Sequence, residues 1–279
     1  MLTSSTRLVG LFGHPVAHSK SPQMHNAAFA ELKLDYAYLA FAVEPPRLSA
    51  AVEAIRALHL RGVNVTIPHK VAVLPLLDEI SKEAELIGAV NTIVNEDGKL
   101  IGYNTDGIGY LSALEEETGI DISGKRVLLL GAGGACRAVA AQMALHGAEH
   151  IAIAARAQER AESLAARLRV HATADGLSLE AAAVQLDAYD VIVNTTPVGM
   201  HPAEDAVPIG TDGLRAGQLV SDLIYNPRKT RFLHEAEARG CVVSGGLGMF
   251  VHQGAHAFRL WTGVAAPIDV MRQTVESCL

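Results

Sequence analysis

One short segment carries three polar side chains at spacings that suit acid–base chemistry. In Gly62–Lys70, Asn64 and Thr66 are two residues apart, and Lys70 follows four residues later. Alternation along a predicted strand over Gly62–Ile67 places Asn64 and Thr66 on one face. Pro68 ends that strand, so we expect the polar pair at its carboxyl end, where open α/β sheets usually bind ligands.

Lys70 is expected at the start of a helix over residues 70–77. A cation there opposes the helix dipole at a cost of about 0.3–1 kcal/mol. A residue that is unfavourable for its local structure, as a cation at a helix N-terminus is, often marks a functional site. The dipole would also help the amine to exchange a proton near neutral pH. The alternative interpretation is an ordinary exposed lysine.

Further polar side chains precede two predicted helices. Asp106 could orient and stabilise a charged Lys70 if the fold joined them, but an Asp before a helix is also a common N-cap. Ser19 and Ser21 offer two hydroxyls beside a helix N-terminus, which suits a carboxylate ligand. The alternative there is capping by Ser21 alone.

A second group of residues suits the binding of a dinucleotide. The apolar run Val127–Leu130 leads into a glycine-rich turn and then a predicted helix. Glycines permit a tight turn and let backbone N–H groups approach a pyrophosphate, and Cys136 is small enough for close helix–strand packing. The alternative is a tight turn without a ligand. The turn consists of Gly131, Ala132, Gly133, Gly134 and Ala135.

The residues after the next predicted strand favour NADP over NAD. An NAD site would usually place Asp or Glu about 20 residues beyond the turn. This chain has Arg156 and Arg160 instead. A guanidinium pairs with a 2′-phosphate and can stack on adenine. The alternative is that both arginines are solvated residues at the start of a helix.

The elements that would position these groups form two series. From Lys125 onward strands and helices alternate, which predicts a parallel, doubly wound sheet and the α/β class. The strands are expected at Arg126–Leu130, His150–Ala154, Val191–Asn194, Leu219–Asp222 and 242–243, with helices at 136–146, Gln158–Leu168 and Arg231–Ala238.

The earlier series has strands at 7–12, 35–43 and 62–67 and a hairpin of 89–95 with 99–102 across Asp97-Gly98, a strong turn signal. Helices are expected from Ser21 to about Leu32, then at 45–58, 81–87 and 107–117. Two helices, 250–261 and 269–278, complete the chain.

Composition excludes several classes of protein. The 279 residues are 49% hydrophobic with a net charge of −7 and no basic stripe, which argues against nucleic-acid binding. Three unclustered cysteines form no disulfide framework, and no targeting or membrane segment is apparent, so we expect a cytoplasmic protein. The pairs His14/His18 and His252/His256 lack a third zinc ligand, so no metal site is expected.

Several ordered segments together resemble the NADP-dependent shikimate dehydrogenase family over nearly the whole chain. The resemblance implies reduction of 3-dehydroshikimate to shikimate, the small-molecule substrate, in aromatic amino-acid (chorismate) biosynthesis. It also implies Lys70 and Asp106 as the catalytic pair. The matching segments are 13–22, 25–26, 64–70, 88–92, 102–107, 131–134, 194–200, 222–227 and 246–253.

The resemblance also assigns binding residues. Ser19 and Ser21 would hold the substrate carboxylate, and Asn64, Thr66, Asn91, Tyr225 and Gln253 would line the ring hydroxyls. The cofactor would contact Gly131, Ala132, Gly133, Gly134, Ala135, Arg156, Arg160 and Thr195, with Leu223, Gly246 and Met249 near the nicotinamide.

The implied organisation has two α/β domains with ligands in the cleft between them. A split substrate-binding domain covers 1–105 and is completed by 250–279, and a Rossmann-type NADP domain covers 106–249. The family usually carries Asn-Arg-Thr where this chain has Ala155-Arg156-Ala157, so some use of NAD is expected.

Two alternatives remain: a quinate/shikimate or amino-shikimate dehydrogenase, and a non-catalytic relative that senses shikimate. Retention of both Lys70 and Asp106 argues against the sensor. The oligomeric state, monomer or homodimer, is left open.

Overall fold

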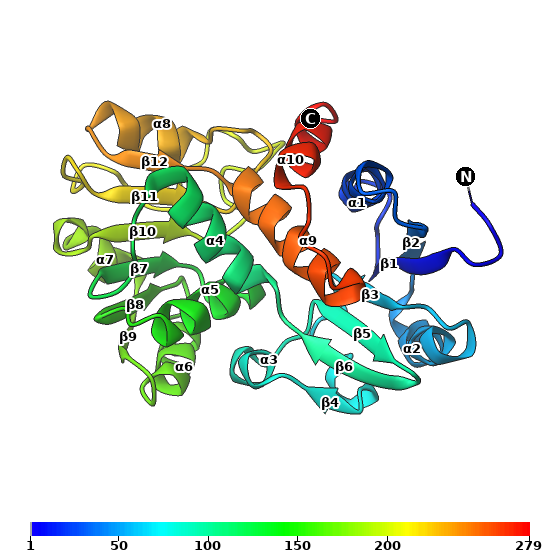
Figure 1. Cartoon of the computed structure of the whole chain (residues 1–279). Helices are drawn as coiled ribbons and strands as arrows, with labels where there is room; N and C mark the ends of the chain where they lie inside the picture. Colours follow the sequence, from blue (N-terminus) through cyan, green and yellow to red (C-terminus); the bar gives the residue numbers. More distant parts are fainter. Residues whose placement is uncertain (1) are drawn as a thin grey trace. The chain divides into compact units, whose positions relative to one another are not determined.

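The computed structural model describes residues 2–279 and divides the chain into two compact units. The first runs to Gly109 and includes Val251–Leu279, and the second is Tyr110–Phe250. Both boundaries fall inside helices, α4 (Asp106–Thr118) and α9 (Gly246–Thr262). The sequence places the boundaries slightly earlier, at 105/106 and 249/250. The helices of each unit are drawn in Figure 1.

A mixed six-stranded sheet forms the first unit, in the order β2-β1-β3-β5-β6-β4. Strands β1, β2 and β3 are parallel, whereas β5 pairs antiparallel with both β3 and β6. The predicted hairpin is confirmed: Asp97 and Gly98 both have positive φ, as its tight turn requires. The strands are β1 (Arg7–Gly13), β2 (Tyr36–Ala42), β3 (Gly62–Val65), β4 (Glu79–Ile80), β5 (Thr92–Glu96) and β6 (Lys99–Tyr103).

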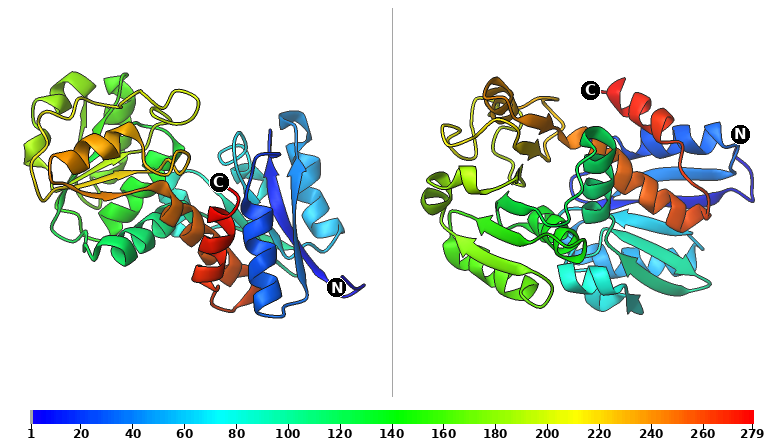
Figure 2. Two further views of the ribbon diagram at one scale, coloured as in Figure 1. Left: turned by 90° about the horizontal axis from the view of Figure 1, so that it is seen from above. Right: turned by 60° about the vertical axis from the view of Figure 1, so that its left-hand side comes forward.

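The first unit also contains α1 (Ser21–Glu31), α2 (Leu48–Ala57), α3 (Lys82–Ile87) and α10 (Ile268–Glu276). Helices α1 and α10 come from opposite ends of the chain and lie side by side (Figure 2). Apolar side chains of α2 and β3 share one core, in which Ile55 and Val63 are fully buried.

The predicted helix over residues 70–77 is wrong. The chain forms turns there and then only a short 3₁₀ helix, Leu74–Leu76. Pro75 lies in the middle of the segment, where its missing N–H and its ring would disrupt an α-helix. Lys70 therefore lies in a turn and not, as expected from the sequence, at the start of a helix.

The second unit contains a fully parallel sheet in the order β12-β11-β10-β7-β8-β9. This order is the doubly wound arrangement predicted from the alternating elements. β9 was not predicted, because Asp175 and Gly176 interrupt its apolar pattern. The strands are β7 (Arg126–Leu130), β8 (His150–Ala154), β9 (Thr173–Leu177), β10 (Val191–Asn194), β11 (Leu219–Asp222) and β12 (Val242–Ser244).

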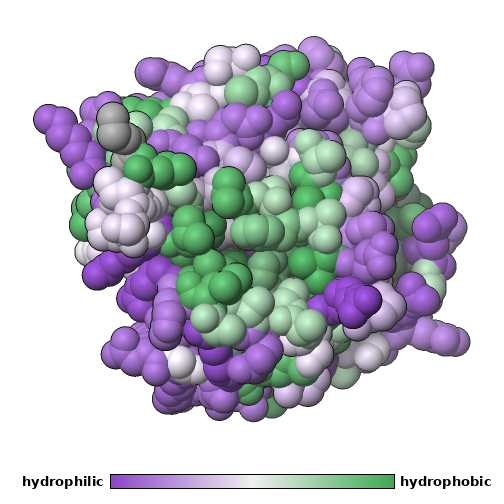
Figure 3. Space-filling model, turned by 90° about the vertical axis from the view of Figure 1, so that its right-hand side faces the viewer, coloured by the Kyte–Doolittle hydropathy of each residue, from purple (hydrophilic) through white to green (hydrophobic). Residues whose placement is uncertain are grey.

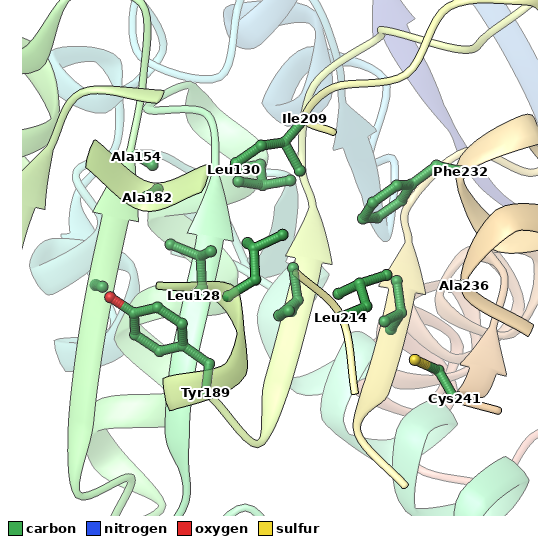
Figure 4. Close-up of a cluster of buried hydrophobic side chains, with 14 of the residues drawn as sticks. Leu128, Leu130, Ala154, Ala182, Tyr189, Ile209, Leu214, Phe232, Ala236 and Cys241 are labelled. Atoms are coloured by element: carbon green, nitrogen blue, oxygen red, sulfur yellow. The ribbon is translucent and has the colours of Figure 1, made fainter. Parts of the chain in front are cut away.

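Helices cover this sheet and bury the apolar strands on both faces. The core drawn in Figure 4 joins Leu128 and Leu130 of β7 to Phe232 and Ala236 of α8. Val127 and Leu129, which alternate with them, are also fully buried, as expected for a parallel strand between two layers. The helices are α5 (Gly134–Leu145), α6 (Gln158–Leu168), α7 (Leu179–Ala183) and α8 (Arg231–Ala238).

Strand β2 is an edge of the first sheet, and its Leu39 is half exposed. Figure 3 shows apolar side chains gathered in the middle of the face that it views.

Within residues 2–279, no helix combines the length and the apolar character needed to cross a membrane.

Candidate functional site

Lys70 and Asp106 form an ion pair in the first unit. Nζ of Lys70 lies 2.6 Å from Oδ2 of Asp106, and the two side chains are 27% and 12% exposed. Lys70 lies in the turn after β3, and Asp106 is the first residue of α4. The fold thus joins the two residues that the sequence singled out separately, and it leaves the amine partly accessible to a ligand.

A second side chain holds the Asp106 carboxylate from the other side. The amide of Asn91 donates to Oδ1 of Asp106 over 2.7 Å and to Oγ1 of Thr105 over 3.0 Å. Oδ1 of Asn91 accepts from the backbone N–H of Thr105. Each oxygen of the Asp106 carboxylate therefore has its own donor, which fixes the orientation of the carboxylate.

Asn64 and Thr66 lie at and just beyond the end of β3. Asn64 is buried and makes several hydrogen bonds inside the unit. The strand ends at Val65, so Thr66 belongs to the following turn and is only partly buried. A Cβ at Gly13 would lie 2.3 Å from the Thr66 side chain, so the absence of a side chain there leaves room for Thr66.

The two serines lie at the start of α1. The backbone N–H of Ser21 is 3.3 Å from Oγ of Ser19. Lys20, not Ser21, occupies the N-cap position, and it provides no capping side chain. The interpretation of Ser21 as the N-cap is therefore wrong, because Ser21 already lies in the first turn, followed by Pro22. The Ser19 hydroxyl thus meets the first amide of α1 in place of an N-cap side chain, and both serine hydroxyls lie beside the helix N-terminus, which suits an anionic ligand.

Gln253 lies against the first turns of α4. A Cβ at Gly109 would be 2.5 Å from the backbone nitrogen of Gln253, so only glycine permits this approach of α9 to α4. Gly109 follows Asp106 by three residues and lies on the same helical face. Helix packing therefore brings Gln253 toward the Lys70–Asp106 pair.

The glycine-rich turn of the second unit opens onto a pocket of about 450 Å³. Gly131 has φ of 111°, and a Cβ there would lie 2.8 Å from Oγ1 of Thr195, so a larger residue would be strained. Gly133 and Gly134 face open space at the start of α5. Residues from the ends of β7, β8 and β10 line the pocket, including Gly131, Ala132, Gly133, Arg156, Arg160 and Thr195.

This pocket fits a dinucleotide phosphate. It lies where the strand order reverses, between β7 and β10, which is the usual place for such ligands. Arg156 and Arg160 line it, and no Asp or Glu does, which favours a phosphate at the ribose over a free 2′-hydroxyl. Cys136 is fully buried, and burial raises the pKa of its thiol to about 12, consistent with a packing role.

The remaining predicted site residues also lie in the second unit. Gly246 and Leu223 are adjacent, since a Cβ at Gly246 would lie 2.1 Å from the Leu223 carbonyl oxygen. The Tyr225 ring lies 5.1 Å from that of Phe250, and burial raises the pKa of Tyr225. Met249 is partly buried in the first turn of α9.

Three residues that hydrogen-bond to Asn64 or Asn91 are not among the site residues predicted from the sequence: Tyr38, Thr92 and Thr105. Thr92 directly follows Asn91 and Thr105 directly precedes Asp106, so adjacency to a predicted site residue is a signal available in the sequence. Tyr38 is not adjacent to any predicted site residue, and in an aromatic strand a tyrosine is not distinctive. In the part of the chain that the structure describes, no group of three or more His, Cys, Asp or Glu could hold a metal.

A doubly wound sheet with a phosphate-binding turn, and a lysine paired with a carboxylate, define the class of dinucleotide-dependent oxidoreductases. Three family profiles match: "Shikimate dehydrogenase substrate binding domain" at 11–93, "Shikimate / quinate 5-dehydrogenase" at 113–201, and "Shikimate 5'-dehydrogenase C-terminal domain" at 246–276. The chain belongs to the shikimate dehydrogenase family.

Relatives match over almost their whole length. The chain is 52% identical to the shikimate dehydrogenase (NADP(+)) of Methanopyrus kandleri, covering 98% of the chain and 96% of the relative. It is 50% identical to that of Geobacillus kaustophilus, covering 98% and 99%. A crystal structure of shikimate 5-dehydrogenase from Listeria monocytogenes in complex with shikimate and NAD is 42% identical, with a TM-score of 0.94 and 98% of each chain covered.

Proposed function

We propose that the chain catalyses the reversible, NADPH-dependent reduction of 3-dehydroshikimate to shikimate. The names of its full-length relatives support this reaction. The observation that carries the proposal is the 2.6 Å contact between Lys70 and Asp106. Reduction of a ketone requires a proton at the carbonyl oxygen, and this pair provides a partly exposed amine held by a carboxylate.

Lys70 donates the proton to the carbonyl oxygen. When bound, NADPH supplies the hydride for the carbonyl carbon. The positive charge of Lys70 also stabilises the alkoxide as it develops. In the oxidation of shikimate, Lys70 takes the proton back from the hydroxyl. Asp106 orients Lys70 through Oδ2, while Asn91 keeps the carboxylate from rotating.

The substrate contacts are proposals as well. Ser19 and Ser21 bind the carboxylate, because they offer two hydroxyl donors beside the N-terminus of α1. Side chains around the Lys70–Asp106 pair bind the ring hydroxyls. They are Asn64, Thr66, Asn91 and Gln253, and we assign Tyr225 to the same role from the family resemblance.

The cofactor is NADP, with NAD as a weaker alternative. Residues 131–135 and Thr195 form the cradle for the pyrophosphate, and Arg156 and Arg160 bind the 2′-phosphate. Ala157 caps α6 without a side-chain hydrogen bond, and Ala155 adds no polar group. Discrimination against NAD therefore rests mainly on the two arginines. Leu223, Gly246 and Met249 contact the nicotinamide in this proposal.

An absorbance assay at 340 nm tests the proposed function. Shikimate with NADP should give rapid reduction of the cofactor, shikimate with NAD a slower one, and quinate with either cofactor the slowest. Faster turnover of quinate than of shikimate would favour the quinate/shikimate alternative. Binding of shikimate without any turnover would favour the sensor.

The cellular compartment and the oligomeric state of the enzyme are also proposals. Cys136, Cys241 and Cys278 are free thiols, which suits a reducing compartment such as the cytoplasm. We propose a monomer or a homodimer, which sedimentation would distinguish.

A further inference from the structure

The phenol of Tyr38 contacts a residue of the proposed substrate site. Its hydroxyl donates to Oδ1 of Asn64 over 2.8 Å, and the Tyr38 side chain is fully buried. Both backbone polar groups of Tyr38 are bonded to the side-chain amide of Asn26, which fixes the strand at this point. The His25 ring stacks on the phenol at a centroid distance of 4.5 Å. Tyr38 therefore presents its hydroxyl to Asn64 in one fixed place.

Thr92 continues the chain of hydrogen bonds from Asn64. The amide nitrogen of Asn64 donates to Oγ1 of Thr92 over 3.0 Å and to the Asn91 carbonyl over 3.2 Å. Oγ1 of Thr92 donates in turn to Oδ1 of Asn91 over 2.9 Å. Asn91 then donates to Asp106. Three side chains, those of Asn64, Thr92 and Asn91, thus connect the buried phenol of Tyr38 to the carboxylate beside Lys70.

The direction of each hydrogen bond in this chain follows from its end at Asp106. An ionised carboxylate can only accept, so Asn91 must turn its NH₂ group toward it. The carbonyl oxygen of Asn91 then faces Thr92, which must donate its single hydroxyl hydrogen. Thr92 consequently accepts from the NH₂ group of Asn64. The carbonyl oxygen of Asn64 is left to accept from Tyr38.

Tyr38 can keep this donor role because it stays protonated. Burial raises the pKa of its phenol well above the ordinary range, although a hydrogen bond with Ser21 opposes the effect. The amide groups in the chain transfer protons poorly, so the chain orients side chains and does not conduct protons. Neither Tyr38 nor Thr92 needs to touch the substrate for this purpose.

We propose that Tyr38 and Thr92 are positioning residues that fix the amide orientations of Asn64 and Asn91 and, through Asn91, the Asp106 carboxylate. This inference rests on the proposed function of the site. Both hydrogens of the Asn64 amide are used inside the protein. Its Oδ1 receives one hydrogen bond in the described structure, so one lone pair remains. Asn64 therefore accepts a hydrogen from a substrate hydroxyl and does not donate one, which selects a hydroxyl over a keto or ether group.

Variants at Tyr38 and Thr92 test this orientation. Tyr38→Phe removes the phenol hydroxyl and should raise the KM for shikimate about tenfold, with kcat changed less than threefold and the KM for NADP unchanged. Thr92→Val replaces the hydroxyl by a methyl group and should also lower kcat about tenfold, because Asn91 loses a donor. Thr92→Ser, which retains the hydroxyl, should restore both constants to within twofold of the parent protein.

Tyr36→Phe provides the matched control. Tyr36 lies on the same strand, and its hydroxyl bonds to the Trp261 carbonyl oxygen, outside the network. That variant should keep all kinetic constants. If Tyr38→Phe and Thr92→Val lowered only the melting temperature and left KM and kcat unchanged, the positioning role would be overturned.

A measurement without turnover separates this inference from the proposed function. Hydrogen exchange of the side-chain amides of Asn64 and Asn91, followed by NMR, should accelerate at least fivefold in Thr92→Val and be unchanged in Tyr36→Phe. Unchanged exchange in Thr92→Val would overturn the positioning role of Thr92, whatever the activity of the variant. If the parent protein were inactive but exchange were accelerated in Thr92→Val, the proposed reaction would be overturned and the positioning role would be supported.

Discussion

Asn91 donates a 2.7 Å hydrogen bond to Oδ1 of Asp106, the carboxylate oxygen that Lys70 does not contact. The carboxylate thereby has a neutral donor on one oxygen and a cationic donor on the other. Two donors fix both the position and the rotation of the carboxylate plane. The position of the Lys70 amine consequently depends on Asn91 as well as on Asp106.

Substitution of Lys70 should act mainly on turnover. Lys70→Ala removes the proposed proton donor and the charge proposed to stabilise the alkoxide, so kcat should fall about 10³-fold. The KM for shikimate should change less than threefold, since other side chains hold the substrate. Steady-state kinetics measures both constants. Lys99→Ala, which removes an exposed lysine paired with Glu79, is the control, and an unchanged kcat in Lys70→Ala would refute the role given to Lys70.

Substitution of Asn91 should weaken catalysis through Asp106. Asn91→Ala leaves Oδ1 without its donor, and kcat should fall about 10- to 100-fold. Removing a buried hydrogen-bond partner should also cost about 1–3 kcal/mol of stability. Asn95→Ala is matched to it, because Asn95 is a buried asparagine that bonds the backbone of Ile55 and Leu60.

The two variants separate stability from catalysis. Asn95→Ala should lose a similar free energy of unfolding in urea titrations while kcat is retained. Equal losses of kcat in both variants would show that Asn91 matters only for folding.

The sequence predicted the parallel sheet of the second unit well, because its signals are local. Val127–Leu130 is a continuous apolar run, and the glycines that follow it can only be understood as a tight turn. β9 escaped prediction because it is an edge strand with polar residues. The helix expected after Lys70 does not form, because Pro75 disrupts a helix whatever the apolar pattern around it.

The sequence indicates which residue types make up the site, but it does not indicate which of those residues contact one another. Lys70 and Asp106 are separated by 36 residues, and Asn91 reaches Asp106 from the position just before β5. Such contacts depend on the pairing of β3 with β5, which no local pattern specifies. Lys70 does not lie at a helix N-terminus, so only the family resemblance identifies it from the sequence.

Preference for NADP should depend on Arg156 and Arg160. Arg156→Ala and Arg160→Ala should each lower kcat/KM for NADP about 10- to 100-fold, since each removes a proposed charge-assisted hydrogen bond to the 2′-phosphate. The kcat/KM for NAD should change less than threefold, because NAD lacks that phosphate. Arg169→Ala removes an arginine paired with Glu162 at the far end of α6 and should alter neither. Equal losses with both cofactors would contradict the assignment.

The conformation of Gly131 should be essential to the second unit. Gly131→Ala places a Cβ at positive φ and 2.8 Å from Oγ1 of Thr195, so about 1–3 kcal/mol of stability should be lost. The KM for NADP should rise as the turn shifts. Gly210→Ala, at a glycine with open space around it, should be nearly neutral in thermal unfolding. A Gly131→Ala protein as stable as Gly210→Ala would show that the turn tolerates a side chain.

Acid should destabilise the first unit through His25. The imidazole is fully buried, neither ring nitrogen has a hydrogen-bond partner among the described residues, and burial lowers its pKa to about 3. Below the ordinary pKa of about 6.5, the unfolded chain binds a proton that the folded unit does not, so stability falls as the pH falls. About 2–3 kcal/mol should be lost between pH 7 and pH 4.5 from this residue.

His25→Phe keeps an aromatic ring against Tyr38 and removes the ionisation. Any loss from repacking is the same at both pH values, so the comparison concerns only how the free energy of unfolding changes with pH. Trp261 is the single tryptophan and lies 5.5 Å from the His25 ring, so its fluorescence follows unfolding of this unit in urea. The variant should lose less stability on acidification than the parent protein. His59→Asn, which replaces an exposed histidine, is the control and should leave the pH dependence of the free energy of unfolding unchanged. If His25→Phe and the parent protein lost the same stability on acidification, groups other than His25 would cause the loss.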